Sequence, residues 1–300
     1  MARVAFVRTL DRVAGVNRAL ELLNLGSFAG KHLFLKPNLN SADPPPGSSH
    51  IDTLRTLIQG LRSLGASRIT VGDRSGMGDT RAVMHRKGLF RLADELGFDL
   101  VVFNELGAEG WERVQVPGSH WQQGFAFARP ALEADGIVLA CCLKTHRFGG
   151  HFTLSLKNSV GLVAAQVPGE GYHYMKELHR SPYQRLMIAE INVAYRPALI
   201  VLDGMEAFVE GGPDQGKQVQ AGVILAGTDR VAVDAVGVAL LRSLGTTPEV
   251  SQGPIFGQEQ IARAVELGLG VGSAAQIELV TDDGESAASA AQVRSILDRG

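Results

Sequence analysis

The stretch Gly136–His146 reads GIVLACCLKTH, and its first eight residues are almost wholly apolar. An apolar run of this length is typical of a strand that is buried on both faces of a parallel sheet. Lys144 and His146 follow the run directly, so a buried strand carries two polar side chains at its carboxyl end. The stretch therefore predicts an α/β protein whose polar residues gather at strand ends.

Short apolar runs of this kind alternate with helical patterns along the rest of the chain. The alternation predicts a layered α/β fold, in which a mainly parallel twisted sheet is flanked by helices. We expect further strands at Val4–Arg8, His32–Lys36, Arg68–Gly72, Asp99–Phe103, Ala198–Leu202 and Val219–Ala226. We expect helices at Arg12–Leu23, Thr53–Leu64, Thr80–Leu96, Thr153–Val163, Tyr183–Tyr195, Ala232–Leu244 and Gln258–Leu267.

The domain organisation is expected to be simple. Residues 1–284 predict a single α/β domain, with two lobes as the alternative, and residues 285–300 predict a terminal helix or frayed tail. Two short β-like pieces in segment 112–127 surround Pro117-Gly118 and indicate a small hairpin. The polar segment 165–181 predicts a mobile flap.

Composition argues against several classes of protein. The 300 residues have a formal net charge of −2 and no long basic run, so binding to nucleic acid or to a membrane surface is not expected. No apolar stretch approaches the roughly 20 residues of a membrane span, and the first residues do not form a signal peptide. Cys141 and Cys142 are adjacent and expected in the core, so no disulfide framework and no four-thiolate iron–sulfur cluster is expected. We expect a cytoplasmic protein, with a homodimer as an open alternative.

Polar clusters follow five of the predicted strands. Ligands of open α/β sheets bind beyond the carboxyl ends of the strands, so we expect these clusters to share one rim. The Gly-rich turn after Asp73 matches neither the dinucleotide fingerprint nor the phosphate-loop pattern, so neither NAD nor ATP is expected. The five clusters are Lys36-Pro37-Asn38, Asp73-Arg74-Ser75-Gly76, Lys144-Thr145-His146, Asp203-Gly204 and Thr228-Asp229.

These clusters supply candidate catalytic residues and candidate ligand-binding residues. Partial burial would lower the pKa of Lys144 and make it a usable base, and His146 could exchange protons near neutral pH. The catalytic candidates are Lys144, His146, Asp73 and Asp203. The candidates for binding an anionic substrate are Lys36, Asn38, Ser75, Gly76, Lys157, Asn158 and His50. A divalent metal is a further candidate ligand, with His146, His151 and Asp203 as its donors.

Structural alternatives exist for several of these residues. Lys36 could be a solvated charge, and Lys157 could lie on the exposed side of a helix. Asp73 could serve as a turn residue or helix cap, and Asp229 as a cap. Asp234 could be a buried structural partner.

Several motifs, in order, resemble the prokaryotic family called domain of unknown function 362. They run from about Lys36 to Asp234 and include Lys36-Pro37-Asn38, Gly72-Asp73, Lys144-Thr145-His146, Ser155-Leu156-Lys157-Asn158, Gly161, Asp203-Gly204, Gly227-Thr228-Asp229 and Ala232-Val233-Asp234. The resemblance implies a common α/β fold and a common site. Many relatives carry a ferredoxin-like module that this sequence lacks, and the stretch Glu210–Pro213 is shorter than usual. The layout is also similar, more distantly, to lactate-racemase-type proteins.

The favoured function is an enzyme that moves a proton on a small carboxylated or phosphorylated substrate, as isomerases and lyases do. Lys36 and Lys157 would hold the anion, and Lys144 and His146 would move protons. One alternative is a protein that binds a metal or metallocofactor. The other is a non-catalytic accessory protein in redox reactions or cofactor maturation.

Overall fold

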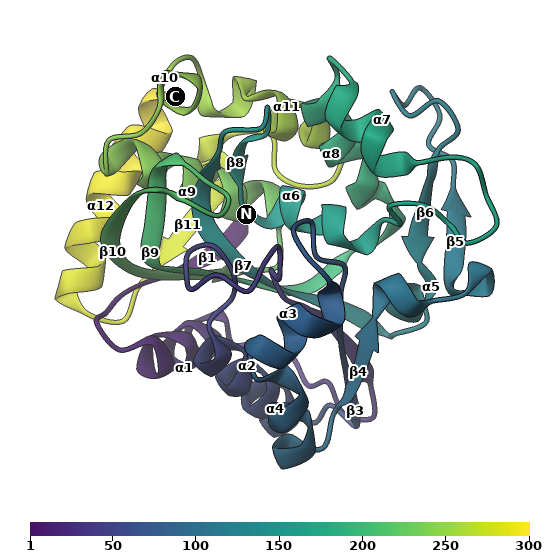
Figure 1. The fold of residues 1–300 in the computed structure, drawn as a ribbon. Coiled ribbons are helices and arrows are strands. Elements are labelled where there is room, and N and C mark those ends of the chain that lie inside the picture. The colour runs from purple at the N-terminus through teal and green to yellow at the C-terminus, as the bar shows by residue number, and fades with distance from the viewer.

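A nine-stranded sheet crosses the middle of the computed structural model, which describes residues 1–300 (Figure 1). Eight strands follow the order β11-β1-β10-β9-β7-β2-β3-β4, and β8 pairs with β7. Strands β9, β7, β2, β3 and β4 run parallel to one another, so the prediction of a mainly parallel sheet is confirmed. The strands are β1 Ala2–Arg8, β2 His32–Lys36, β3 Arg68–Asp73, β4 Asp99–Val102, β7 Gly136–His146, β8 His151–Thr153, β9 Pro197–Gly211, β10 Gly216–Gly227 and β11 Ile277–Val280.

Strand β10 runs antiparallel to both of its neighbours, β1 and β9. Its last residue, Gly227, pairs with Ile200 near the start of β9. The cluster Thr228-Asp229 therefore lies beside the amino ends of the parallel strands, whereas the other site residues follow the carboxyl ends of β2, β3 and β7. The expectation that all five strand-end clusters share one rim is wrong for this one.

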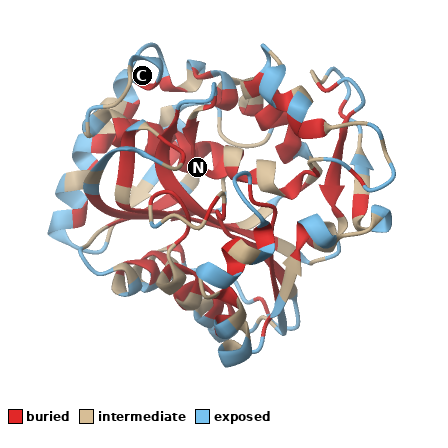
Figure 2. Ribbon diagram, viewed as in Figure 1, coloured by how far each residue is buried: buried red, intermediate tan, exposed pale blue.

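Helices cover both faces of the sheet and enclose two apolar cores (Figures 1 and 2). On one face lie α1 Arg12–Leu23, α2 Ile51–Ser63, α3 Thr80–Arg86 and α4 Leu89–Leu96, over a core of 28 buried residues. The other face holds a core of 55 buried residues. Its helices include α6 Ser155–Asn158, α7 Tyr174–Arg180, α8 Gln184–Ile191, α9 Arg230–Ser243, α10 Pro248–Ser251, α11 Glu259–Glu266 and α12 Gly284–Arg299.

Helix α9 is the central helix of the larger core. Asp229 caps it by accepting a hydrogen bond from the Ala232 amide at 2.9 Å, and its first twelve residues are all buried. A helix that is buried on every side is stable only when it is surrounded by other elements. Helix α12 supplies part of that cover by packing against α9 and β1. The terminal-helix alternative for the C-terminal residues is thus the one observed.

Several predicted elements are shorter or divided. The predicted helix Thr80–Leu96 is broken by Gly88, whose φ of 77° is a left-handed conformation that glycine adopts readily. The predicted helix Thr153–Val163 is divided into the end of β8, the one-turn helix α6 and a 3₁₀ helix at Ser159–Leu162. The predicted helix Tyr183–Tyr195 ends at Ile191 and continues as a 3₁₀ turn. Strands β8 and β11 were not predicted.

The predicted hairpin is a separate two-stranded antiparallel sheet of β5 Trp111–Val114 and β6 Phe125–Ala128, beside the short helix α5 Arg129–Leu132 (Figure 1). The predicted pieces are Val114–Val116 and Gly124–Phe127, so the first strand begins three residues earlier than predicted and the second begins one residue later. The predicted flap contains helix α7. None of the helices is both long enough and apolar enough to cross a bilayer.

Candidate functional site

A polar cavity lies where the carboxyl ends of β2, β3 and β7 meet helix α6. Its open space, including the mouth, is about 420 Å³. Only two of its fifteen lining residues are hydrophobic, so the cavity suits a polar ligand. Eight predicted site residues line it: Lys36, Asn38, Asp73, Gly76, Lys144, His146, Lys157 and Asn158.

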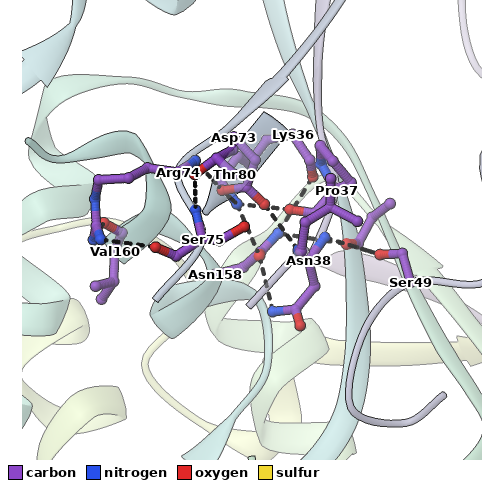
Figure 3. Close-up of polar contacts among 12 residues, drawn as sticks. Lys36, Pro37, Asn38, Ser49, Asp73, Arg74, Ser75, Thr80, Asn158 and Val160 are labelled. Carbon is purple, nitrogen blue, oxygen red and sulfur yellow. Dashed lines mark hydrogen bonds and ion pairs between the residues drawn. The ribbon is translucent and has the colours of Figure 1, made fainter. Parts of the chain in front are cut away.

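A buried ion pair between Lys36 and Asp73 forms the floor of the site (Figure 3). Lys36 Nζ lies 2.8 Å from Asp73 Oδ1 and also donates to the Pro37 carbonyl at 2.6 Å. The Asp73 carboxylate accepts the backbone amides of Leu39 at 2.8 Å and Arg74 at 2.7 Å. Burial lowers the pKa of Lys36 and raises that of Asp73, and the attraction between the two opposes both changes. The opposite charges of Lys36 and Asp73 therefore balance each other, and the pair supplies no net charge to a ligand.

Asn158, on helix α6, connects the residues of the floor. Its Oδ1 accepts hydrogen bonds from Lys36 Nζ at 3.3 Å and from Asn38 Nδ2 at 3.2 Å (Figure 3). Its Nδ2 donates to the Lys36 carbonyl at 3.3 Å. Gly161 packs directly on the ion pair, because an added Cβ would collide with Asp73 Oδ1 and lie 2.8 Å from Lys36 Nζ. The segment from α6 to Gly161 is therefore fitted closely to the floor.

Lys144 is fully buried at the end of β7, and neutral oxygens surround its ammonium group. Its Nζ donates to Asn38 Oδ1 at 2.9 Å, to the Gly47 carbonyl at 2.6 Å and to the Pro213 carbonyl at 3.4 Å. Burial lowers its pKa. Because all three protons are donated to protein oxygens, Lys144 is better placed to supply positive charge than to accept a proton.

Lys157 differs from the other cavity lysines because its Nζ has no hydrogen-bond or ion-pair partner in the protein, although the side chain is half-buried. Burial, together with the nearby charges of Lys144 and Arg74, lowers its pKa to about 7. An amine with this pKa is neutral in about half of the molecules at neutral pH, which suits a group that exchanges protons.

Three buried polar atoms in residues that line the cavity also lack partners: Asn40 Nδ2, His146 Nδ1 and Thr153 Oγ1. Burial lowers the pKa of His146 far below its ordinary value, and the charges of Lys157 and Lys144 add to this effect. His146 is therefore a neutral imidazole. Buried polar groups in folded proteins are nearly always hydrogen-bonded, so these atoms indicate a place that a ligand or water fills.

Arg74 is a cavity residue that was not predicted as a site residue. Its guanidinium is buried and donates to the Val160 carbonyl at 3.2 Å (Figure 3). It also donates to the Val163 carbonyl at 2.8 Å and to Met175 Sδ at 3.1 Å. Burial lowers its pKa to about 10, so it stays charged at neutral pH. Its place next to Asp73 in the strand-end cluster was the available signal. Asn40, Thr153 and Gly161 were likewise not predicted, although Gly161 belongs to the motifs of the resemblance.

The cavity lining carries more positive than negative charge. Lys36, Arg74, Lys144 and Lys157 are four cations, and Asp73 is the single carboxylate, which gives a difference of +3 when Lys157 is protonated. Uncompensated charge is costly at a partly buried site, so this arrangement favours binding of an anion.

Asp203 is a predicted site residue that does not line the cavity. Its carboxylate is held by Arg12 Nε at 2.9 Å and by the Thr53 hydroxyl at 2.5 Å. It pairs in register with Cys142, two residues before Lys144, where α1 and α2 cover the sheet. Its carboxylate therefore contacts Arg12 and Thr53 and none of the cavity residues, and its expected role in orienting the catalytic groups stays a prediction.

Three other predicted residues also lie outside the cavity lining. His50 caps helix α2, with its Nδ1 accepting the Asp52 amide at 3.1 Å. His151 faces His146 across the β7–β8 pair and lines a neighbouring depression with Glu249. Ser75 is buried, and its hydroxyl has no partner. No three histidine, cysteine, aspartate or glutamate side chains lie close enough together to hold a metal ion, so His146, His151 and Asp203 do not form a ligand set.

Comparison with known proteins agrees with this picture of the fold. The model of the family described as "Domain of unknown function (DUF362)" matches residues 33–239. The "Thylakoid-associated protein sll1697" of Synechocystis sp. is 24% identical over 235 residues, which are 77% of this chain and 70% of that protein. The lactate racemase apoprotein from Thermoanaerobacterium thermosaccharolyticum is structurally similar, with a TM-score of 0.50 and 17% identity. That match covers 80% of this chain and 57% of the racemase chain, and at this identity it concerns the fold alone.

Proposed function

The chain belongs to the DUF362 family, and we propose that its cavity binds a small carboxylate or phosphate compound and moves a proton on it. The observation that carries the proposal is Lys157, an amine without a protein partner and with a pKa of about 7, in a cavity of excess positive charge. Anion binding and proton exchange at neutral pH are the two properties that this combination provides.

The charge of the ligand would be balanced by Lys144 and Arg74, and by Lys157 as well when that amine is protonated. Lys157 Nζ is free to contact the anion, whereas Lys144 and Arg74 act through space because they donate hydrogen bonds to other protein atoms. The unpartnered Asn40 Nδ2 and Thr153 Oγ1 offer hydrogen bonds to a second, uncharged oxygen. We therefore favour a substrate with a hydroxyl or carbonyl oxygen beside its carboxylate.

The proton transfer assigns a different role to each lysine from the one expected from the sequence. Neutral Lys157 would take a proton from the carbon beside the carboxylate, and the electron pair of the broken C–H bond would move toward the oxygens of the substrate. The positive charges of Lys144 and Arg74 would stabilise the negative charge that develops there. Return of the proton from Lys157 to the same or a neighbouring atom would give an isomerase-like reaction.

Two measurements test the proposal. Calorimetry with oxalate and with inorganic phosphate tests binding, and loss of C–H signals in deuterated water tests proton exchange on a panel of 2-hydroxy and 2-oxo acids. We expect Lys157→Met to abolish exchange and Lys217→Met, a change at an exposed lysine paired with Glu210, to leave it intact. A wild-type protein that binds neither anion would overturn the proposal.

The alternative of a metal-binding protein has less support, because the cavity offers one carboxylate that is already paired with Lys36. The accessory-protein alternative predicts binding without exchange, so the same two measurements separate it from an enzyme.

A further inference from the structure

Asp234 is a fully buried carboxylate on helix α9 that lies outside the cavity lining and takes part in no ion pair. It accepts three hydrogen bonds, from the Ser155 amide at 2.8 Å, the Ser155 hydroxyl at 2.5 Å and the Leu156 amide at 3.0 Å. All three donors belong to the first two residues of helix α6. Asp234 therefore satisfies the amino end of α6 from a different helix.

Helix α6 needs such support because it is a single turn of four residues, Ser155–Asn158. Isolated helices of this length are not stable, and the first amides of any helix lack partners within the helix. Its own preceding residue, Leu154, has no side chain that can accept a hydrogen bond. The carboxylate from α9 thus replaces the local cap.

A second contact fixes the same two elements against each other. Gly237, one turn after Asp234 on α9, approaches the Leu154 side chain so closely that an added Cβ would lie 2.9 Å from Leu154 Cδ1. Helix α9 is long and buried along most of its length, so it provides a rigid support.

Helix α6 carries two residues of the site. Lys157 and Asn158 follow the residues that Asp234 holds, and Asn158 in turn contacts Lys36 and Asn38. A small rotation of α6 would therefore move the unpartnered amine and loosen the floor of the cavity at the same time.

We propose that Asp234 is the positioning residue of the site, which sets the place of Lys157 and Asn158 through helix α6. The inference rests on the proposed function for its meaning, and it goes beyond that proposal by assigning a role to a residue that touches no ligand. Burial raises the pKa of Asp234 to about 6 against the effect of its three hydrogen bonds. Burying a carboxylate is costly, and an apolar residue at this position could not accept the hydrogen bonds from Ser155 and Leu156 that hold helix α6.

The test reads the pKa of Lys157 directly and needs no substrate. The chain has seven lysines, so reductive methylation with ¹³C-formaldehyde gives few NMR signals, and Lys157→Arg identifies the signal of interest. We expect Asp234→Asn to raise the pKa of Lys157 by at least about one pH unit as water reaches the displaced amine. Oxalate affinity should fall about tenfold.

Asp229→Asn is the matched control, because Asp229 caps the same helix α9 and also accepts the Val271 amide at 3.0 Å, at the far edge of the sheet. It should lower Tm without moving the pKa of Lys157. Ser155→Ala removes the hydroxyl contacts to Asp234 and to the Arg230 carbonyl but keeps the two amide contacts to Asp234, so it can serve as the test if Asp234→Asn does not fold. A wild-type titration of Lys157 in both Asp234→Asn and Ser155→Ala would overturn the inference. A wild-type protein that binds no anion would overturn the proposed function and leave this titration to decide the inference by itself.

Discussion

Replacing Lys157 by methionine should stabilise the folded protein while it destroys the proposed activity. The change removes no hydrogen bond and no ion pair, and methionine is of similar length. The fall of the Lys157 pKa from 10.5 to about 7 means that the folded protein disfavours the charged amine. Each pKa unit corresponds to about 1.4 kcal/mol, so this fall means that the charged amine lowers the free energy of unfolding by at most about 5 kcal/mol. Because the side chain is partly exposed and water screens its charge, we expect a gain of about 2 kcal/mol at neutral pH.

The pH dependence of the gain gives the sharper measurement. Between about pH 7 and pH 10.5 the unfolded chain keeps the Lys157 proton and the folded protein has lost it, so the stability of the wild type should rise with pH across this window. The Lys157→Met variant lacks this contribution. Its advantage in Tm, about 5 °C at pH 7, should therefore shrink as the pH rises.

Thermal unfolding followed by circular dichroism at several pH values checks this expectation, with Lys217→Met as the control for loss of an exposed lysine. Oxalate binding, measured by calorimetry, should weaken by about tenfold to a hundredfold. A Lys157→Met protein that melts below the Lys217→Met protein would refute the reasoning, because it would mean that Lys157 has stabilising contacts in the folded state. Unchanged oxalate affinity in the Lys157→Met protein would refute the proposed role of Lys157 in binding the anion.

Two further substitutions test other parts of the site, and a pH series tests Lys157 again. Gly161→Ala should lower the free energy of unfolding by about 3 kcal/mol because the new methyl group collides with the buried ion pair, whereas Gly171→Ala, in open surroundings, should be nearly neutral in the same urea titration. Lys144→Met should destabilise by about 2–4 kcal/mol, opposite in sign to the change at Lys157, because it leaves carbonyl oxygens buried without a donor; a stability gain would contradict this account. Oxalate affinity of the wild type should fall as the pH rises through about 7, where Lys157 loses its charge, and calorimetry at about pH 6 and pH 9 should show no such fall for Lys157→Met.

Much of the fold was predictable because strands and helices leave strong patterns in the sequence. The rule that ligands bind at the carboxyl ends of parallel strands correctly brought together Lys36, Asp73 and Lys144, which lie up to 108 positions apart. The sequence was enough here because parallel strands bring their carboxyl ends to the same side of the sheet, whatever the pairing register.

The failures came from features that depend on register and direction. Asp203 continues the face of β9 that includes Leu199 and Val201, and both pack in the core under α1 and α2. Its position along the strand direction, two residues before Lys144, depends on the β7–β9 register that pairs it with Cys142, and the sequence does not reveal this register. The direction of β10, which decides the position of Asp229, is likewise a property of the whole sheet. His50 lies outside the cavity lining because its ring nitrogen accepts the Asp52 amide at the start of α2, a capping role that the sequence suggests for serine more readily than for histidine.

The pairing of β1 with β10 has a consequence for how the chain folds. Arg8 pairs with Val223, and Ala2 pairs with Ile277, so during synthesis β1 finds its two neighbours only after more than two hundred further residues. Such distant pairing slows folding, and an unpaired strand can associate with other chains in the meantime. A fragment limited to residues 33–239 would leave the outer edge of β10 permanently open, and this makes it a poor choice for expression.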